Sequence, residues 1–330
     1  MSARNDAEEV LGILARKIEN AVDEISGKYD WSNVSSDNLD QLAFQYAVTV
    51  RDFLDPYMRN QSMLKSQMGQ NVRVKGTDNT TYAVDYVGGQ VLDLLLKRWS
   101  EAGNKGGWSK FDEEDEQFIH IGDGPRKKII TDPFDNTTFG MVGYRDCNVA
   151  VCLADENNQF INACVADLQT DAVYFADRNG SWLYYVADNK IERSCKLKTS
   201  SKTELSGSYL ITPHFKRERR IAFSKTRLFS EKVQTFNMGG PLSICRLAEG
   251  QYNEIHGYLD FDEGKKGQPI YEIIYFPMAI KAGACVTDMD GNEFNFEELL
   301  SRLEKDPKAR YRFVAGCTRE LHDELLSKVT

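Results

Sequence analysis

The sequence predicts an α/β fold, an α+β layering in which helices pack around two sheets. Three observations predict it. Apolar residues recur at helical spacing up to about residue 100, short apolar runs between turn residues follow from residue 128, and strand-like and helix-like segments alternate beyond residue 208. A chain of 330 residues can form one large or two modest domains. We expect an N-terminal α+β domain over 1–198 and a C-terminal α/β domain over 199–330.

Three helices are expected in the first hundred residues. The first contains the one-sided apolar stripe of 10–25. The second covers 37–64 with a break at Pro56, because proline lacks a backbone N–H and clashes with the preceding turn. The third covers 82–99 and ends where the glycines of 103–107 begin a loop.

Strands are expected from residue 128 onward, where the apolar pattern changes from helical to extended. Four apolar runs follow one another closely, at 148–154, 160–166, 172–176 and 182–186. Turn residues separate them at short spacing, which is typical of an antiparallel meander.

Composition excludes several classes of protein. Hydrophobic residues make up 41% and charged residues 28%, as in globular proteins. The net charge of -9, with acids and bases mixed along the chain, leaves no concentrated basic face, so no nucleic-acid polymer is expected as a partner. No apolar run could cross a bilayer and no signal-type stretch opens the chain, so we expect a soluble, cytoplasmic protein without a membrane partner. The seven cysteines lack a CxxC pair and are expected to be reduced packing residues.

The sharpest local pattern is an apolar strand that ends in Asp132, Pro133, Phe134 and Asp135. Pro133 stiffens the turn, so the two carboxylates and the Phe134 carbonyl can surround one point with the oxygen ligands that Mg²⁺ prefers. An isolated pattern of this kind is as often a turn with Asx-type capping. By itself it therefore leaves both readings open.

Three further acidic positions favour the metal site. The run 111–116 alone is typical of a solvated loop, and Asp85 alone would suit the dipole at the start of its helix. Glu272 is the strongest of the three, because large apolar residues flank it on both sides. A carboxylate buried in such surroundings is costly unless it is paired or binds a metal.

In this order, the motifs resemble those of the inositol monophosphatase and fructose-1,6-bisphosphatase superfamily of lithium-sensitive, magnesium-dependent phosphatases. The stretch Asp132–Thr137 resembles the motif DPxDG[ST], and Glu113 with Glu114 resembles the acidic pair upstream of it. The segment 271–284 is closer to the fructose-bisphosphatase branch, whereas 239–250 is closer to the inositol branch. The resemblance spans about 75–291 and implies the αβαβα layers of the sugar phosphatase fold.

The resemblance also implies a role for each matching residue. It implies two or three Mg²⁺ ions, with Mn²⁺ as a substitute and Li⁺ as an inhibitor. The implied metal ligands are Glu113, Asp132, the Phe134 carbonyl, Asp135 and Glu272. The residues implied to hold and deprotonate the attacking water are Asp85, Glu114 and Thr137. The residues expected to contact phosphate or substrate are Asn136, Thr137, Gly239, Gly240, His256 and Tyr258.

The resemblance implies a hydrolase, namely a Mg²⁺-dependent phosphatase that removes phosphate from a monoester of a small sugar, cyclitol or related polyol. It also implies a homodimer, which is common in the family. One alternative is a sugar bisphosphatase or 3′-phosphonucleotide phosphatase. Its second phosphate would need cations, which could be Lys216, Arg217, Arg219 and Arg220. Another is an inactive homologue that binds a phosphorylated ligand. Asn136 favours it, since the family has glycine at this close approach to phosphate.

Overall fold

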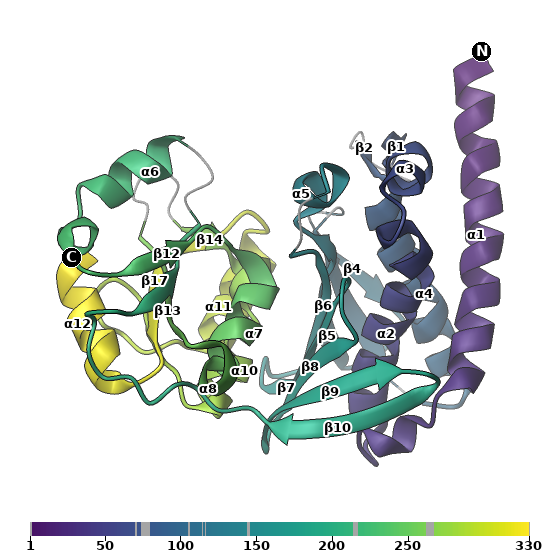
Figure 1. The fold of residues 1–330 in the computed structure, drawn as a ribbon. Coiled ribbons are helices and arrows are strands. Elements are labelled where there is room, and N and C mark those ends of the chain that lie inside the picture. The colour runs from purple at the N-terminus through teal and green to yellow at the C-terminus, as the bar shows by residue number, and fades with distance from the viewer. Residues whose placement is uncertain are drawn as a thin grey trace. The chain divides into compact units, whose positions relative to one another are not determined.

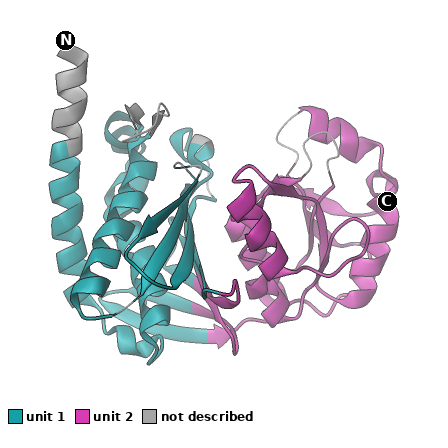
Figure 2. Cartoon of the chain, turned by 180° about the vertical axis from the view of Figure 1, so that it is seen from behind, with its two compact units in different colours: residues 1–156, 164–173, 184–194 teal, residues 157–163, 174–183, 195–330 magenta. Residues whose placement is uncertain are grey.

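The computed structural model describes residues 2–69, 71–73, 80–104, 106–113, 115, 117–143, 146–213, 217–261 and 267–329. The chain forms two compact units, which Figure 2 colours separately. The first contains Met1–Glu156, Cys164–Val173 and Tyr184–Ser194, and the second contains the remaining stretches, Asn157–Ala163, Tyr174–Leu183 and Cys195–Thr330. The predicted domain boundary between residues 198 and 199 stays a prediction. In the structure the long final stretch of the second unit begins at Cys195, and Asn157–Ala163 and Tyr174–Leu183 also group with this unit.

Helices of the first unit cover its sheet in two tiers. Helix α2 packs on strand β6 and α4 packs on β5, while α1 packs on both helices from outside (Figure 1). Their bounds, with those of the shorter helices, are α1 Ser2–Lys28, α2 Asn38–Met58, α3 Gln61–Met63, α4 Ala83–Glu101 and α5 Thr137–Met141. The helices predicted over 10–25 and 82–99 are confirmed.

The predicted break at Pro56 is wrong. Helix α2 continues through this proline and ends at Met58. A proline inside a helix costs about 3 kcal/mol. Leu54 and Tyr57 on either side of it are both buried, so packing against the core holds the last turn in helical form despite this cost.

The first sheet has eight strands in the order β10-β9-β8-β7-β6-β5-β3-β4. Strand β5 runs parallel to β3 and antiparallel to β6. The strands are β3 Gly107–Asp112, β4 Gln117–Ile121, β5 Arg126–Asp135, β6 Asn148–Ala154, β7 Phe160–Asp167, β8 Ala172–Asp177, β9 Gly180–Ala187 and β10 Lys190–Lys196. The strands from β6 to β9 match the four predicted runs, and their consecutive order confirms the meander. Strands β3 and β4, on either side of the acidic run, were not predicted.

The second unit is built on a five-stranded sheet in the order β12-β11-β13-β17-β15. Its strands are β11 Tyr209–Ile211, β12 Gln234–Phe236, β13 Ile255–Asp260, β15 Cys285–Thr287 and β17 Phe313–Gly316. Its helices are α6 Arg217–Ser224, α7 Gly240–Ala248, α8 Gly250–Asn253, α9 Ile270–Ile273, α10 Pro277–Ala282, α11 Phe296–Lys305 and α12 Arg319–Val329. Helix α7 packs on β13 and α12 packs on β17, on opposite faces of the sheet (Figure 1).

Two small antiparallel ribbons complete the topology, β1 Asn71–Arg73 with β2 Thr80–Tyr82, and β14 Gln268–Pro269 with β16 Arg310–Tyr311. All seven cysteines are free, as predicted. None of the helices within the described ranges has both the length and the apolar content that a bilayer crossing requires. Helices packed on mixed sheets confirm the predicted layered α/β fold class.

Candidate active site

The motif of the candidate site begins at an irregularity near the end of β5. Asp132 pairs with Ala150 of β6 and Asp135 pairs with Asn148, so three steps along β5 face two steps along β6. This bulge accommodates Pro133, which cannot donate to a regular ladder. The sheet register therefore breaks where the two aspartates of the motif lie.

A glycine allows helix α4 to approach this irregular end of β5. A Cβ atom on Gly88 would lie 2.1 Å from the Cβ of Pro133, so any larger residue would push the helix away. Asp85 lies one turn earlier in the same helix and is buried. The missing side chain at Gly88 thus lets the first turn of α4 reach the aspartate motif.

Thr137 joins the two elements. Its hydroxyl oxygen lies 3.1 Å from Oδ1 of Asp85 and 2.8 Å from the carbonyl oxygen of Phe134. The hydroxyl carries one proton and can donate it to either acceptor. Two of the residues predicted to hold the attacking water, Asp85 and Thr137, are therefore in direct contact.

Asp132 is buried, and its charge acts on Tyr46, a residue that the sequence did not single out. Burial, with the charges of Asp112 and Asp132 adding to it, raises the pKa of the Tyr46 phenol well above its ordinary value. Tyr46 is fully buried. It therefore stays protonated and uncharged next to these carboxylates.

Asp135 is 7% exposed, and its Oδ2 accepts hydrogen bonds from Nδ2 of Asn148 at 2.8 Å and Nδ2 of Asn136 at 3.0 Å. The pKa of this carboxyl is raised to about 8, chiefly by burial and also by the charges of Glu113 and Asp146, while hydrogen bonds from the Asn148 side chain and the Asn136 backbone act to lower it. Burial and the nearby acidic groups therefore disfavour the ionised form of Asp135.

Asn136 adopts the backbone conformation that glycine would supply. Its φ of 67° and ψ of 35° lie in the left-handed region, which asparagine tolerates better than most residues. Its side-chain amide donates to the backbone carbonyl of Asp146 at 3.1 Å as well as to Asp135. The turn of the motif thus keeps its geometry without a glycine.

The other predicted metal ligands are placed only in part. Glu113 follows β3 and is half-buried, and its charge acts on Asp135. Glu114 lies outside the described residues. Glu272 lies in α9 of the second unit and is half-buried between the buried Ile270 and Ile273. Its convergence with the other ligands stays a prediction.

The residues predicted to bind substrate in the second unit have interior contacts. Gly239 precedes α7 in an extended conformation, while Gly240 has a φ of 75° and donates its N–H to the Tyr258 hydroxyl at 3.1 Å. Tyr258 is fully buried, and Nδ1 of His256 accepts the Tyr209 N–H at 3.0 Å. Burial, with Lys202 adding to it, lowers the pKa of His256. Roles in substrate binding stay predictions for these residues.

The donor atoms around β5 suit a hard divalent cation. The carboxylates of Asp85, Asp132 and Asp135 are buried close to the end of this strand, and the Phe134 carbonyl supplies a fourth oxygen. The pKa of Asp135 is raised by burial first and by nearby acidic charges second, so its ionised form would gain from a positive charge beside it. Within the described part of the chain, no three or more His, Cys, Asp or Glu residues form a complete metal centre. The oxygen donors thus fit such a cation, in an arrangement that these residues do not complete.

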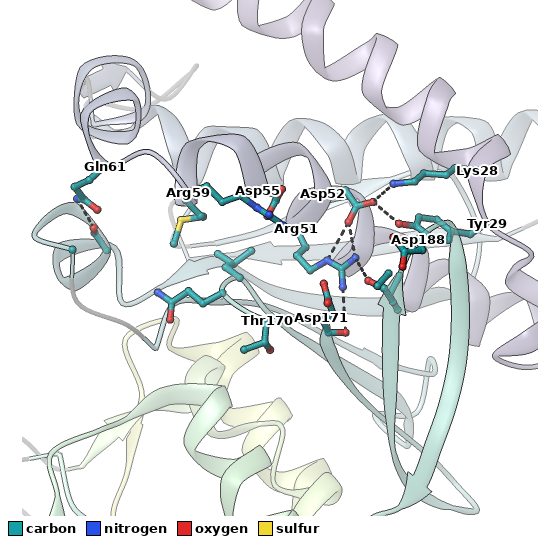
Figure 3. Close-up of a pocket in the computed structure, with 17 residues that line it drawn as sticks. Lys28, Tyr29, Arg51, Asp52, Asp55, Arg59, Gln61, Thr170, Asp171 and Asp188 are labelled. Carbon is teal, nitrogen blue, oxygen red and sulfur yellow. Dashed lines mark hydrogen bonds and ion pairs between the residues drawn. The ribbon is translucent and has the colours of Figure 1, made fainter.

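A separate cavity of about 810 Å³ lies in the first unit, lined by the end of α1, by α2 and by the turns that follow β7 and β9 (Figure 3). Asp52 accepts hydrogen bonds there from Lys28 at 3.0 Å, Tyr29 at 2.7 Å and Arg51 at 2.6 Å. Arg51 also donates to the Val186 carbonyl at 2.8 Å. These groups form hydrogen bonds and ion pairs with one another, so the network links α1 and α2 to each other and to the sheet.

Comparison with known proteins gives matches to solved structures alone. No family model matches the sequence, and no curated protein matches it. The extragenic suppressor protein SuhB from Bartonella henselae has a TM-score of 0.62 and 17% identity, over 87% of this chain and 96% of that one. The inositol monophosphatase from Anabaena has a TM-score of 0.59 and 18% identity, over 87% and 93%.

A third structure combines the two activities in its name. The MJ0109 gene product, an inositol monophosphatase-fructose 1,6 bisphosphatase, has a TM-score of 0.61 and 17% identity, over 87% of this chain and 98% of that one. Likeness at this identity establishes the fold. The chain therefore has the fold of the inositol monophosphatase and fructose-1,6-bisphosphatase superfamily, the superfamily that its motifs resemble.

Proposed function

We propose that the protein is a divalent-cation-dependent phosphatase that hydrolyses a phosphomonoester of a small sugar, cyclitol or related polyol. One observation carries the proposal: the Thr137 hydroxyl lies between the Asp85 carboxylate and the Phe134 carbonyl, at the strand end that bears Asp132 and Asp135. The buried carboxylates supply the oxygen donors, and the contact between Thr137 and Asp85 supplies a path for a proton.

The cation, Mg²⁺ or Mn²⁺, would be held by Asp132, Asp135, Glu113 and the Phe134 carbonyl. When bound, such a cation neutralises phosphate charge and makes water a better nucleophile at neutral pH. The family resemblance implies that Glu272 would complete the ligand set and that Glu114 would belong to the water-activating group.

Asp85 and Thr137 would position the attacking water and receive its proton. When the Thr137 hydroxyl donates to Oδ1 of Asp85, its oxygen keeps lone pairs that can accept a hydrogen bond from water. The water is thereby oriented, and the buried Asp85 carboxylate is within reach of the proton through Thr137.

The substrate class rests on the structural neighbours. Those with printed activities are inositol monophosphatases, and one is also named a fructose 1,6 bisphosphatase. Phosphorylated polyols are common to both names. Roles for Asn136, Gly239, Gly240, His256 and Tyr258 at the substrate belong to this proposal, as do the homodimer and inhibition by Li⁺.

The bisphosphatase alternative would need free cationic groups for a second phosphate. Arg219 does not offer one, because it lies 3.1 Å from Asp260 and donates to the Pro213 carbonyl. Arg217 and Arg220 are exposed on α6 and stay candidates. Lys216 lies outside the described residues. The inactive homologue was suggested by Asn136, which stands where the family has glycine. Asn136 adopts the left-handed backbone that glycine would supply, so the backbone geometry of this turn does not favour inactivity.

A panel of inositol, sugar, sugar bisphosphate and nucleotide phosphates tests the proposal through release of inorganic phosphate. We expect turnover of at least one polyol monophosphate with Mg²⁺, its loss on chelation and its return when Mg²⁺ is added back. Asp132→Asn should reduce turnover by at least about 100-fold. The matched control Asp188→Asn, in the exposed turn after β9 at a φ of 50° that asparagine tolerates, should not. Turnover that is indifferent to chelation, or unchanged in Asp132→Asn, would contradict the proposal.

A further inference from the structure

Two amide groups converge on one oxygen of Asp135. Its Oδ2 accepts a hydrogen bond from Nδ2 of Asn148 at 2.8 Å and another from Nδ2 of Asn136 at 3.0 Å. A carboxylate oxygen can accept about two such bonds. Both side-chain amides therefore hold Oδ2, and neither of them holds Oδ1.

Asn148 occupies a position that packing alone does not explain. It is fully buried at the start of β6, pairs with Asp135 across the sheet and precedes the apolar run Val149–Ala154. Its Oδ1 is buried and accepts no hydrogen bond from the described residues. A buried amide with an unmet acceptor destabilises a fold, so a strand position that served packing alone would favour an apolar residue.

Asn136 is fixed in orientation by two acceptors. Its Nδ2 donates to Oδ2 of Asp135 and to the backbone carbonyl of Asp146 at 3.1 Å. The Asp146 carbonyl accepts hydrogen bonds only, and so does the Asp135 carboxylate when it is ionised, so in that state the NH₂ group faces both and the amide orientation is fixed. The glycine of the DPxDG[ST] motif has no side chain to make either bond.

We propose that Asn136 and Asn148 are positioning residues that hold Oδ2 of Asp135 and thereby direct Oδ1 to the divalent cation. The two donors come from either side of the bulge in β5, one from the next residue and one from the neighbouring strand. Together they restrict rotation of the carboxylate about its Cβ–Cγ bond. Groups that orient a ligand in this way typically affect metal affinity about 10- to 100-fold.

The inference rests on the proposed function for the identity of the cation, and binding is tested separately from turnover. Mn²⁺ affinity of the full-length protein is measured by isothermal titration calorimetry and by electron paramagnetic resonance, and folding by circular dichroism. Asn136→Gly suits the left-handed backbone, so this variant keeps the turn while it loses the amide. Asn148→Leu removes the second donor and keeps the branched shape of the side chain, at a larger volume.

Matched controls remove similar groups elsewhere. Asn158 also has a positive φ, of 65°, and its side-chain amide donates hydrogen bonds to Ser301 and Glu304 in the second unit. Asn158→Gly therefore reproduces the backbone change of Asn136→Gly away from the candidate site. Asn162→Leu removes another fully buried amide, near the start of β7. A role in folding alone would lower the thermal midpoint of any of these variants without changing the Mn²⁺ affinity of the folded protein.

We expect Mn²⁺ to bind about tenfold more weakly to Asn136→Gly and to Asn148→Leu, more weakly still to the double variant, and unchanged to both controls. Affinity within twofold of wild type in folded Asn136→Gly and in the folded double variant would overturn the inference. If the wild type binds Mn²⁺ and hydrolyses no phosphate ester, the proposed function fails and the positioning role still stands or falls on these affinities. A wild type that binds no Mn²⁺ would overturn both.

Discussion

The hydroxyl oxygen of Thr137 lies 3.1 Å from Oδ1 of Asp85, although 52 residues separate the two in the chain. This contact joins the first turn of α4 to the turn that follows β5. Neither element would place a water-orienting pair by itself. Their junction depends on the close approach of α4 and Pro133 that Gly88 permits.

Removing the hydroxyl should slow hydrolysis with little effect on folding. We expect Thr137→Val to lower kcat by about 100-fold, because general acid–base groups contribute factors of this order. If Thr137 acts through Asp85, the double variant with Asp85→Asn should be little slower than the slower single variant. Steady-state kinetics measure all three. Fully multiplicative losses would show that the two residues act independently.

A methyl group at Gly88 should separate α4 from the motif. The added Cβ would lie 2.1 Å from the Cβ of Pro133, so we expect Gly88→Ala to reduce the free energy of unfolding by about 1–3 kcal/mol and to reduce activity. Gly12→Ala is the matched control, because no atom lies within 4 Å of its added Cβ in α1. It should stabilise the protein by about 0.5–1 kcal/mol. Urea unfolding measures both changes, and equal effects of the two substitutions would contradict the packing argument.

The network around Asp52 should make stability depend on pH in the acidic range. Burial tends to raise the pKa of Asp52, but Arg51 and the neighbouring donors outweigh it, so this pKa is lowered in the folded protein. A lowered carboxyl pKa contributes stability that is fully present above the unfolded value near 3.9 and is lost as the pH falls through the folded value.

Asp52→Asn should therefore destabilise the protein at pH 7, by about 3 kcal/mol, because it leaves the buried Arg51 without its carboxylate. Its stability should also fall less steeply below pH 4 than that of the wild type. Asp55→Asn is the control, since its ion pair with Arg59 is exposed to solvent and contributes little to stability. Denaturant unfolding across this pH range measures both. Parallel pH profiles for wild type and Asp52→Asn would contradict the assignment.

Periodicity predicted much of the fold because it reflects burial directly. The helices α1 and α4 and the strands β6 to β9 follow from apolar spacing alone. Strands β3 and β4 were missed because a charged run lies between them, and the helix through Pro56 because packing outweighed a local preference. The local sequence pattern predicts a helix or strand well where tertiary packing favours the same structure.

The sequence predicted the motif residues of the candidate site but not the residues that pack around them. The aspartates and Thr137 share a short stretch of chain, so the motif identified them. Tyr46 and Asn148 reach the site through helix packing and strand register, which one sequence does not specify. For Asn148 one signal was present, a polar residue at the edge of an apolar run. The meeting of Glu272 with the first unit stays a prediction.

The central claim is that the carboxylates at the end of β5 bind a divalent cation. Crystals soaked in Mn²⁺ test it most directly through the anomalous scattering of the metal. We predict an anomalous peak within about 2.5 Å of carboxylate oxygens of both Asp132 and Asp135, absent from Asp132→Asn crystals. An active protein whose Mn²⁺ peaks all lie away from these two residues would contradict the account.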